Sequence, residues 1–174
     1  PATLYAGTES GVFKSTDGAL TWASSTSGLG SRPVTALAGS APVLFAGTAD
    51  GGVFKTTDGG ASWSALPIAA FGRSVVSLAI DPVIPANVLA GTSGGHAIFR
   101  STDGGVSWAV SNAGIERQSV VDLALDPSTP SVLYAATAEG GVWKSVDGAS
   151  SWTFASTGLT RADLLAVAVD PRTP

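Results

Sequence analysis

One eight-residue phrase occurs four times in this sequence, and the repetition constrains the fold more than any other feature. Each copy has Asp at its third position and Trp at its last, and the copies span residues 15–22, 56–63, 101–108 and 145–152. Successive Asp residues are 41, 45 and 44 positions apart. A period of this length is typical of the four-stranded blade of a β-propeller. The chain is therefore expected to be built from four blade-like repeats.

The residues between the phrases predict four strands in each repeat. Residues 119–126 alternate apolar with small or polar side chains and stop at Asp126-Pro127, as a half-buried strand does. Further short apolar runs follow at residues 132–137, 141–145 and 151–154, separated by Gly-containing turns. No segment shows the sustained apolar spacing of a helix. We expect an all-β protein of four-stranded antiparallel blades, with repeats at about 1–40, 41–84, 85–129 and 130–174.

The order of the strands leaves the number of blades in the complete ring open. The sequence starts on the second strand of a repeat, and residues 164–170 match the first strand at residues 120–126. This last strand is expected to complete the first blade or to pair with a neighbour, which would protect an exposed sheet edge. Residues 1–174 are thus expected to form a single propeller unit. It is a closed four-bladed ring, a segment of a larger ring, or half of a ring made with a second copy.

Composition excludes several kinds of site and partner. The formal net charge of −4 argues against nucleic acid, whose phosphates require a basic surface. With no Cys and one His, neither disulfides nor a structural zinc site is expected. No apolar run is long enough for a membrane span, and no phosphate-binding or calcium-binding loop motif occurs. We expect no cofactor and no metal.

Each repeat also carries one Arg shortly before its first strand. In an antiparallel blade these arginines fall at the end opposite the repeated Asp phrase, and the first strand of a blade is its innermost. The series is therefore expected to gather near the axis, where guanidinium groups suit carboxylate or phosphate partners. Its members are Arg32, Arg73, Arg117 and Arg161. The alternative is that each Arg pairs with an acid on the same face, from the set Glu9, Asp50, Glu116, Glu139 and Asp163.

The repeated phrase resembles the Asp-box of BNR-repeat propellers, Ser/Thr-x-Asp-x-Gly-x-Thr/Ser-Trp. The second and third copies fit fully, whereas Ala19 and Ala149 replace the Gly of the fifth position and are expected to distort or loosen their turns. The resemblance implies a structural turn, and an Asp carboxylate can accept backbone N–H groups of the next residues. The residues expected to have this structural role are Asp17, Trp22, Asp58, Trp63, Asp103, Trp108, Asp147 and Trp152. The flanking phrases look most like the photosystem II assembly factor group and also like xyloglucan-hydrolase and sortilin propellers.

The shared residues belong to the scaffold, so function must be argued from the remaining side chains. Glycoside hydrolysis needs two suitably spaced carboxylates, and only Glu116, Asp122 and Asp163 lie outside repeated structural positions and turns. They form no obvious pair, so no catalytic residue is predicted. We expect a non-catalytic scaffold that binds a protein or an anionic or glycan ligand on its Arg-bearing face. The alternative is the scaffold portion of a secreted glycoside hydrolase of the xyloglucanase or sialidase type, and the resemblance implies an extracellular or periplasmic location.

Overall fold

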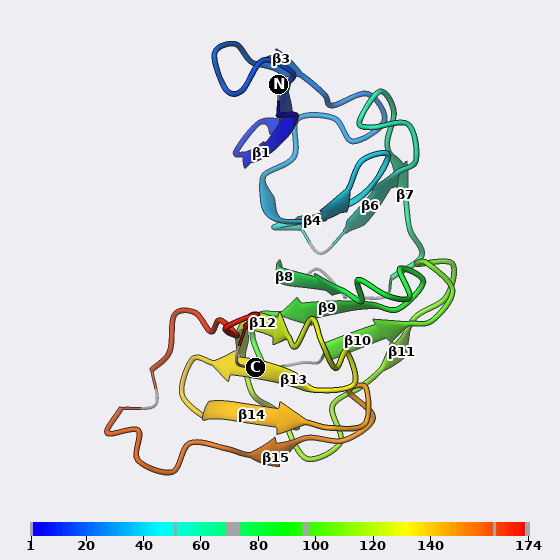
Figure 1. Cartoon of the computed structure of the whole chain (residues 1–174). Coiled ribbons are helices and arrows are strands. Elements are labelled where there is room, and N and C mark those ends of the chain that lie inside the picture. Colours follow the sequence, from blue (N-terminus) through cyan, green and yellow to red (C-terminus); the bar gives the residue numbers. More distant parts are fainter. Residues whose placement is uncertain (1, 51, 69–73, 96–97, 162, 173–174) are drawn as a thin grey trace. The chain divides into compact units, whose positions relative to one another are not determined.

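The structure is a computed structural model that describes residues 2–50, 52–68, 74–95, 98–161 and 163–172. Its regular secondary structure consists of β-strands, and none of the described residues lies in a helix. Consequently, the described part of the chain contains no helix long and apolar enough to span a bilayer. The prediction of an all-β protein is confirmed (Figure 1).

The chain divides into two compact units, the first of which is Pro1–Val75. It contains a three-stranded antiparallel sheet in the order β1-β2-β3 and a four-stranded antiparallel sheet in the order β4-β5-β6-β7. Each strand pairs with the next one along the chain, which is the arrangement of a propeller blade. The strands are β1 (Leu4–Thr8), β2 (Gly11–Ser15), β3 (Ala23–Ser24), β4 (Val34–Ser40), β5 (Val43–Thr48), β6 (Val53–Thr56) and β7 (Ser64–Ala65).

The second unit, Val76–Pro174, contains two four-stranded antiparallel sheets of the same order. The strands are β8 (Val75–Ile80), β9 (Val88–Thr92), β10 (Ile98–Ser101), β11 (Ala109–Val110), β12 (Val120–Leu125), β13 (Leu133–Thr137), β14 (Gly141–Ser145) and β15 (Thr153–Phe154). Four antiparallel sheets, one for each repeat, confirm the predicted blades (Figure 1). The prediction that residues 1–174 form a single propeller unit concerns how the two units join, and it stays a prediction.

Residues 164–170, the expected last strand, are assigned to no strand in this structure. They nevertheless keep two contacts of a first strand. The amide of Val167 donates to the Asp122 carboxylate at 3.1 Å, as the amide of Leu123 donates to the Ser77 hydroxyl at 3.1 Å. The Arg172 amide donates to the Asp170 carboxylate at 2.8 Å and closes the turn that follows. The segment thus lies beside β12 in the place of a first strand, and its completion of the first sheet remains a prediction.

The core of each unit lies between its two sheets, where apolar residues of neighbouring repeats pack together. In the first unit the buried cluster is Val12, Leu29, Leu44, Ala46, Phe54 and Trp63. In the second unit it is Ala79, Leu89, Ile98, Ile115, Val120, Leu123, Leu133, Ala135, Ala149 and Trp152. Alternate residues of a strand point to opposite faces, so the alternation in the sequence supplies these clusters from several strands at once. Each cluster contains one Trp of the repeated phrase, which connects that phrase with blade-to-blade packing.

Candidate binding surface

The turn between the third and fourth strands of every repeat is closed by the same hydrogen bonds to its Asp. The Asp103 carboxylate accepts the Ser101 hydroxyl at 2.8 Å, the Ser107 amide at 2.9 Å and the Ser107 hydroxyl at 2.5 Å. The equivalent three bonds are made to Asp17, Asp58 and Asp147. All donors lie two or four residues from their Asp, so each turn is built from its own sequence.

These bonds lower the pKa of the four Asp carboxyl groups, because they stabilise the ionised form. The hydroxyl four residues after the Asp is the largest cause, followed by the amide of the same residue. The pKa falls to about 2 for Asp17, Asp103 and Asp147, and lower still for Asp58. A carboxyl group held in this range is ionised at neutral pH, which does not suit the general acid of a glycosidase.

Ala19 and Ala149 adopt the backbone conformation of the Gly residues that they replace. Their φ angles are +73° and +68°, against +84° for Gly60 and +91° for Gly105 at the same position. Their amides donate to the Ser15 and Ser145 hydroxyls at 2.9 Å, as the Gly60 amide donates to Thr56. The two turns are therefore not loosened as expected. Instead each holds a non-Gly residue in the left-handed region, at a cost of about 1 to 2 kcal/mol.

Two of the repeated Trp residues dock onto the loop that follows the preceding sheet. The Trp63 indole Nε1 donates to the Ser25 carbonyl at 2.8 Å, and its backbone amide donates to the Ser27 carbonyl at 2.8 Å. Trp152 makes the same two bonds, to the carbonyls of Ser111 and Ala113 at 2.9 and 2.8 Å. Both rings are 3 % exposed. These Trp residues join adjacent blades within each unit.

The other two Trp residues of the phrase have different surroundings. Trp108 is half-buried, and its Nε1 donates to the Gly105 carbonyl of its own turn at 3.1 Å. Trp22 is 42 % exposed, although the hydrogen bonds of its Asp17 turn are intact. The turn therefore forms without the docking of its Trp.

Arg32, the first of the predicted ligand-binding arginines, is paired within its own unit. Its guanidinium group forms an ion pair with the Asp50 carboxylate, and its Cζ lies 5.6 Å from the centre of the Phe54 ring. The Thr48 hydroxyl and, to a lesser extent, the charge of Arg32 lower the pKa of Asp50. Arg32 thus follows the alternative in which an acid of the same face neutralises the cation.

The other arginines of the series are not neutralised in this way where the structure describes them. Arg117 and Arg161 are exposed, and neither forms an ion pair with a described residue. Arg117 also has a φ of +65°, an uncommon conformation for a residue with a long side chain. Its neighbour Glu116 accepts the Gly114 amide at 2.9 Å, which lowers the pKa of Glu116. Arg73 lies outside the described residues.

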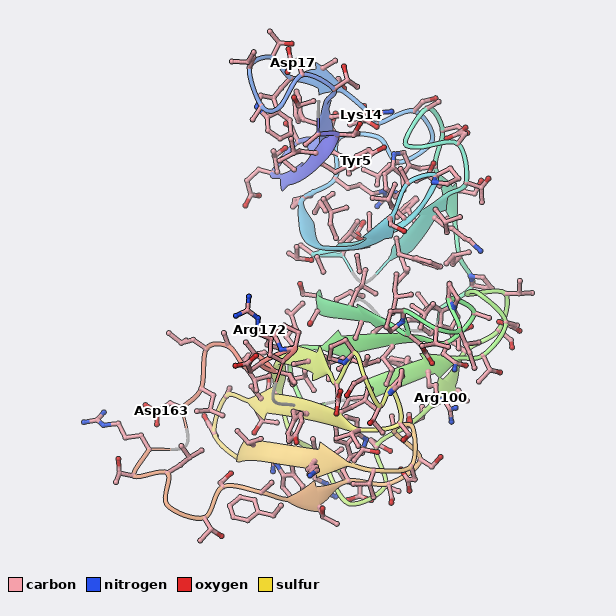
Figure 2. The ribbon with its side chains drawn as sticks, viewed as in Figure 1. Tyr5, Lys14, Asp17, Arg100, Asp163 and Arg172 are labelled. Carbon is pink, nitrogen blue, oxygen red and sulfur yellow. The ribbon has the colours of Figure 1, made fainter. Side chains whose placement is uncertain are left out.

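A second series of cations, on the third strands, lies over aromatic rings. The Nζ atoms of Lys14, Lys55 and Lys144 lie 5.5, 5.2 and 5.4 Å from the ring centres of Tyr5, Phe45 and Tyr134. Lys14 lies beside Tyr5 (Figure 2), and both side chains also donate to the Gly59 carbonyl of the next repeat, at 2.8 and 2.9 Å. The aliphatic stems of such lysines can cover apolar surface while the charged ends stay in water. The rings beneath these cations add cation–π attraction.

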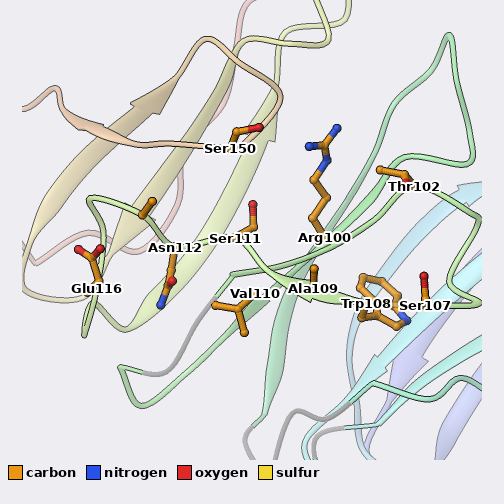
Figure 3. A pocket seen from close by; sticks show the side chains of 11 residues that line it. Arg100, Thr102, Ser107, Trp108, Ala109, Val110, Ser111, Asn112, Glu116 and Ser150 are labelled. Atoms are coloured by element: carbon orange, nitrogen blue, oxygen red, sulfur yellow. The ribbon is translucent and has the colours of Figure 1, made fainter.

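Arg100, the fourth member of this second series, lines a pocket of about 500 Å³ in the second unit (Figure 3). Arg100 as a residue is half-buried, and its guanidinium group has no hydrogen bond or ion pair to any described residue. The lining residues are Arg100, Thr102, Ser107, Trp108, Ala109, Val110, Ser111, Asn112, Ala113, Glu116 and Ser150. A cation, an aromatic ring, several hydroxyls and a carboxylate therefore surround one pocket, a set of groups suited to an anionic or sugar ligand.

Sequence reasoning missed this pocket because its residues come from several places: the third and fourth strands of one repeat, the turn between them, the loop after the fourth strand, and the turn of the following repeat. The available signal was that Arg100 alone replaces Lys in its series. Within the described ranges, no three His, Cys, Asp or Glu side chains are grouped closely enough to hold a metal ion.

Comparison with known proteins places the fold among propellers. No protein-family model and no curated protein sequence matches the chain. Among solved structures, it is similar to YCF48 bound to D1 peptide, with 19 % identity over 98 % of this chain and a TM-score of 0.72. An extracellular domain from B. thetaiotaomicron matches 94 % of the chain with 18 % identity and a TM-score of 0.73. The GH74 xyloglucanase from Xanthomonas campestris matches 91 % with 18 % identity and a TM-score of 0.69.

The chain spans only part of each of these structures. It covers 55 % of the YCF48 chain, 23 % of the B. thetaiotaomicron chain and 29 % of the xyloglucanase chain. These similarities show a shared β-propeller fold, in agreement with the antiparallel sheets described above.

Proposed function

We propose that this chain is a non-catalytic propeller scaffold that binds a protein or an anionic or glycan ligand on the face bearing Arg32, Arg73, Arg117 and Arg161. One observation carries the proposal. Four guanidinium groups of an acidic protein have no acidic partner among the described residues, those of Arg100, Arg117, Arg161 and Arg172, and the first three lie on the Arg-bearing loops or in the pocket. An unpaired guanidinium group is a strong donor for carboxylate, sulfate or phosphate oxygens.

In the third repeat, a residue that lines the pocket and the arginine of the Arg-bearing loop are adjacent in the sequence. Glu116 lines the pocket, and Arg117 follows it directly. A ligand in the pocket could thus stack on Trp108, hydrogen-bond to the pocket hydroxyls, and place a negative group near Arg100 or Arg117. Among the three arginines of the face that the structure describes, Arg117 and Arg161 are expected to contribute more than Arg32, whose charge Asp50 already neutralises.

The structural neighbours support a binding function without identifying the ligand. YCF48 was solved with a D1 peptide bound, so a propeller of the same fold holds a protein segment. The X. campestris protein is a xyloglucanase. This neighbour therefore supports a glycan as the second class of ligand, beside a protein segment. The lowered pKa of the Asp in each repeated turn supports a non-catalytic scaffold over the hydrolase alternative.

Retention on heparin, a sulfated glycan, tests the proposal as a function of salt. The double variant Arg117→Ala with Arg161→Ala and the single variant Arg100→Ala should elute at lower salt than the unmodified chain. Arg172→Ala is the matched control, because it removes an exposed cation outside the proposed surface. Each neutralised contact should lower the slope of log affinity against log salt by about one.

Two results would contradict the proposal. If Arg100→Ala eluted together with Arg172→Ala, and the double variant shifted by no more than twice as much, only net charge would matter. Turnover of a xyloglucan or aryl glycoside by the unmodified chain would instead favour the hydrolase alternative.

A further inference from the structure

The pocket beside Arg100 has a counterpart in the first unit, at the same place between one repeat and the next. Each pocket is lined by the third and fourth strands of a repeat, the loop after them and the turn of the following repeat. Lys14 stands at the position of Arg100, and Ser25 at that of Ser111. The two are called the Arg100 pocket and the Lys14 pocket, with volumes of about 500 and 290 Å³. One place in the repeat can thus be compared in two units.

The two repeats that border each pocket are joined by the same hydrogen bonds. The hydroxyls of Ser25 and Ser111 donate to carbonyls of the following turn, those of Gly60 and Ala149. The Trp of the following repeat donates to the carbonyl of the same Ser in both pockets. The difference between the pockets therefore lies in the side chains that surround the cation.

The cation of the Lys14 pocket is already held by its own chain. The Lys14 ammonium group and the Tyr5 hydroxyl both donate to the Gly59 carbonyl, at 2.8 and 2.9 Å. The same ammonium group lies 5.5 Å from the centre of the Tyr5 ring. A carbonyl and an aromatic ring thus stabilise this charge, and a ligand would have to displace them.

The cation of the Arg100 pocket lacks these contacts because one residue of the neighbouring strand differs. Leu89 pairs with Arg100 across the sheet as Tyr5 pairs with Lys14, and it provides neither a hydroxyl nor a ring. The guanidinium group still lies near the following turn, since a Cβ added to Gly148 would meet its Nη2 at 3.5 Å. It donates no hydrogen bond to a described residue, so its N–H groups are left to solvent or to a ligand.

Two acids beside Arg100 are engaged elsewhere. Asp81 and Asp147 line an adjoining hollow together with Arg100, yet neither forms an ion pair with its guanidinium group. The Asp81 carboxylate accepts the amides of Val83 and Ile84, at 2.8 and 2.9 Å. The Asp147 carboxylate accepts the hydrogen bonds of its own turn. The charge of Arg100 is therefore open to an anion from outside the chain.

The other end of the Arg100 pocket presents groups that suit hydroxyls. Figure 3 shows Glu116 on the far side of Ser111 and Asn112 from Arg100. The Glu116 carboxylate accepts the Gly114 amide at 2.9 Å and keeps further lone pairs for a ligand. The side-chain amide of Asn112 makes no hydrogen bond within the described part of the chain. A carboxylate accepts from a hydroxyl, and an amide both accepts and donates.

We propose that the Arg100 pocket binds one acidic sugar residue of a glycan, an inference that rests on the binding function proposed above. The carboxylate or sulfate group of the sugar pairs with the Arg100 guanidinium group. The ring hydroxyls donate to Glu116 and exchange hydrogen bonds with Asn112. The Lys14 pocket does not bind this ligand, because its cation is held by Gly59 and Tyr5.

A sugar fits these groups better than an acidic peptide side chain does. A sugar carries an acidic substituent and several hydroxyls on one ring, so it can bond to both ends of the pocket. A peptide carboxylate would pair with Arg100 and leave Asn112 and Glu116 without a partner. The volume of about 500 Å³ also lies within the range of small-ligand sites.

A nuclear magnetic resonance titration of the full chain tests the proposal with four small probes. Glucuronate should shift the amide signals of residues 107–116 and Ser150, and leave those of the Lys14 pocket unchanged. Glucose, which lacks the carboxylate, and acetate, which lacks the ring, should each bind about tenfold more weakly or worse. Glucose 6-sulfate separates the two acidic groups. Tighter binding than glucuronate assigns a sulfated sugar, and weaker binding assigns a uronate.

Three variants test whether the guanidinium group carries the binding. Arg100→Ala should weaken glucuronate binding about tenfold or more, because it removes the charge and the forked hydrogen bonds together. Arg100→Lys keeps the charge without the fork and should weaken binding about fivefold. Lys14→Ala is the matched control, because it removes the equivalent cation of the other pocket, and it should leave the affinity unchanged. Unchanged amide signals elsewhere confirm that each variant is folded.

Failure of this inference is distinguishable from failure of the proposed function. Heparin retention that no arginine variant changes would overturn the proposed function itself. If the Arg117 and Arg161 double variant lowers retention while neither acidic sugar shifts the Arg100 pocket, only the sugar site is overturned. Equal shifts in both pockets, or an unchanged affinity of Arg100→Ala, would also overturn it. So would tighter binding of an acidic peptide than of either acidic sugar, which would favour a protein segment instead.

Discussion

Trp152 and Trp22 end the same repeated phrase, yet one is a core residue and the other is largely open to solvent. Their turns are alike, because Asp147 and Asp17 accept the same three hydrogen bonds and both have a pKa of about 2. The rings differ, with 3 % of Trp152 exposed and 42 % of Trp22. The turn is therefore encoded locally, whereas burial of the Trp depends on the loop after the fourth strand of a preceding sheet. One motif thus contains a local part and a part that needs a neighbour.

The largest expected effect on stability is the loss of a docked Trp. Trp152→Ala should lower the free energy of unfolding by about 3 to 5 kcal/mol, because it empties a buried site. Trp22→Ala should lower it by about 1 kcal/mol or less, because its ring is largely exposed. Urea unfolding at high dilution measures both values. Equal losses of stability at the two positions would show that Trp152 and Trp22 do not differ in docking.

A methyl group added to the loop that follows a fourth strand gives the next largest contrast. Gly114 and Gly158 have the same φ of +93°, so replacement by Ala imposes the same backbone strain at both positions. Only at Gly114 does the new Cβ overlap the Trp152 carbonyl oxygen. Gly114→Ala should thus cost about 2 kcal/mol more than Gly158→Ala in unfolding of the dilute chain. A smaller cost at Gly114 would mean that the Trp peptide is not docked there.

The loss of stability at low pH should be similar for the Asp17 and Asp147 repeats, because it comes from the ionised carboxyl group of each turn. A carboxyl group with a lowered pKa stabilises the folded state fully above about pH 4, and its contribution is lost as the pH falls toward 2. Asp17→Asn and Asp147→Asn should each flatten the fall of the urea midpoint over this range, and by similar amounts. A flattening confined to Asp147→Asn would show that the turn also depends on the docked Trp.

The smallest effect concerns the two alanines in the left-handed conformation. Ala19→Gly should raise the free energy of unfolding by about 0.5 to 1 kcal/mol, because it relieves backbone strain at an exposed position. Ala149→Gly should gain less, because it also removes a fully buried methyl group. Thermal unfolding of the two variants side by side checks the order, and a larger gain at Ala149 would contradict it.

The sequence predicted the parts of the molecule that are repeated and local. The alternation in residues 119–126 and the spacing of the Asp phrase were sufficient for the strands and the sheets. Sequence reasoning did not find the loops that receive Trp63 and Trp152, although Gly28, Gly114 and Gly158 each follow a Trp of the phrase by six positions. Glycine is common in turns, and only the three-dimensional approach of a Trp peptide shows why it is needed at these positions.

The arginine series shows a different limit of sequence reasoning. Its four members occupy equivalent positions, and periodicity suggested equivalent roles. In the structure Arg32 is paired with Asp50, whereas Arg117 has no acidic partner among the described residues. Pairing depends on whether the loop between the second and third strands brings an acid close, and spacing along the sequence does not determine that distance.

Hydrogen exchange of the indole N–H groups tests the central claim most directly, that each docked Trp donates to the loop of the preceding blade. The indole signals of Trp63 and Trp152, assigned by single Trp→Phe replacements, should exchange slowly at every protein concentration. The Trp22 signal should exchange quickly. Rapid exchange of Trp63 and Trp152, or protection of Trp22 at the highest dilution, would contradict the account.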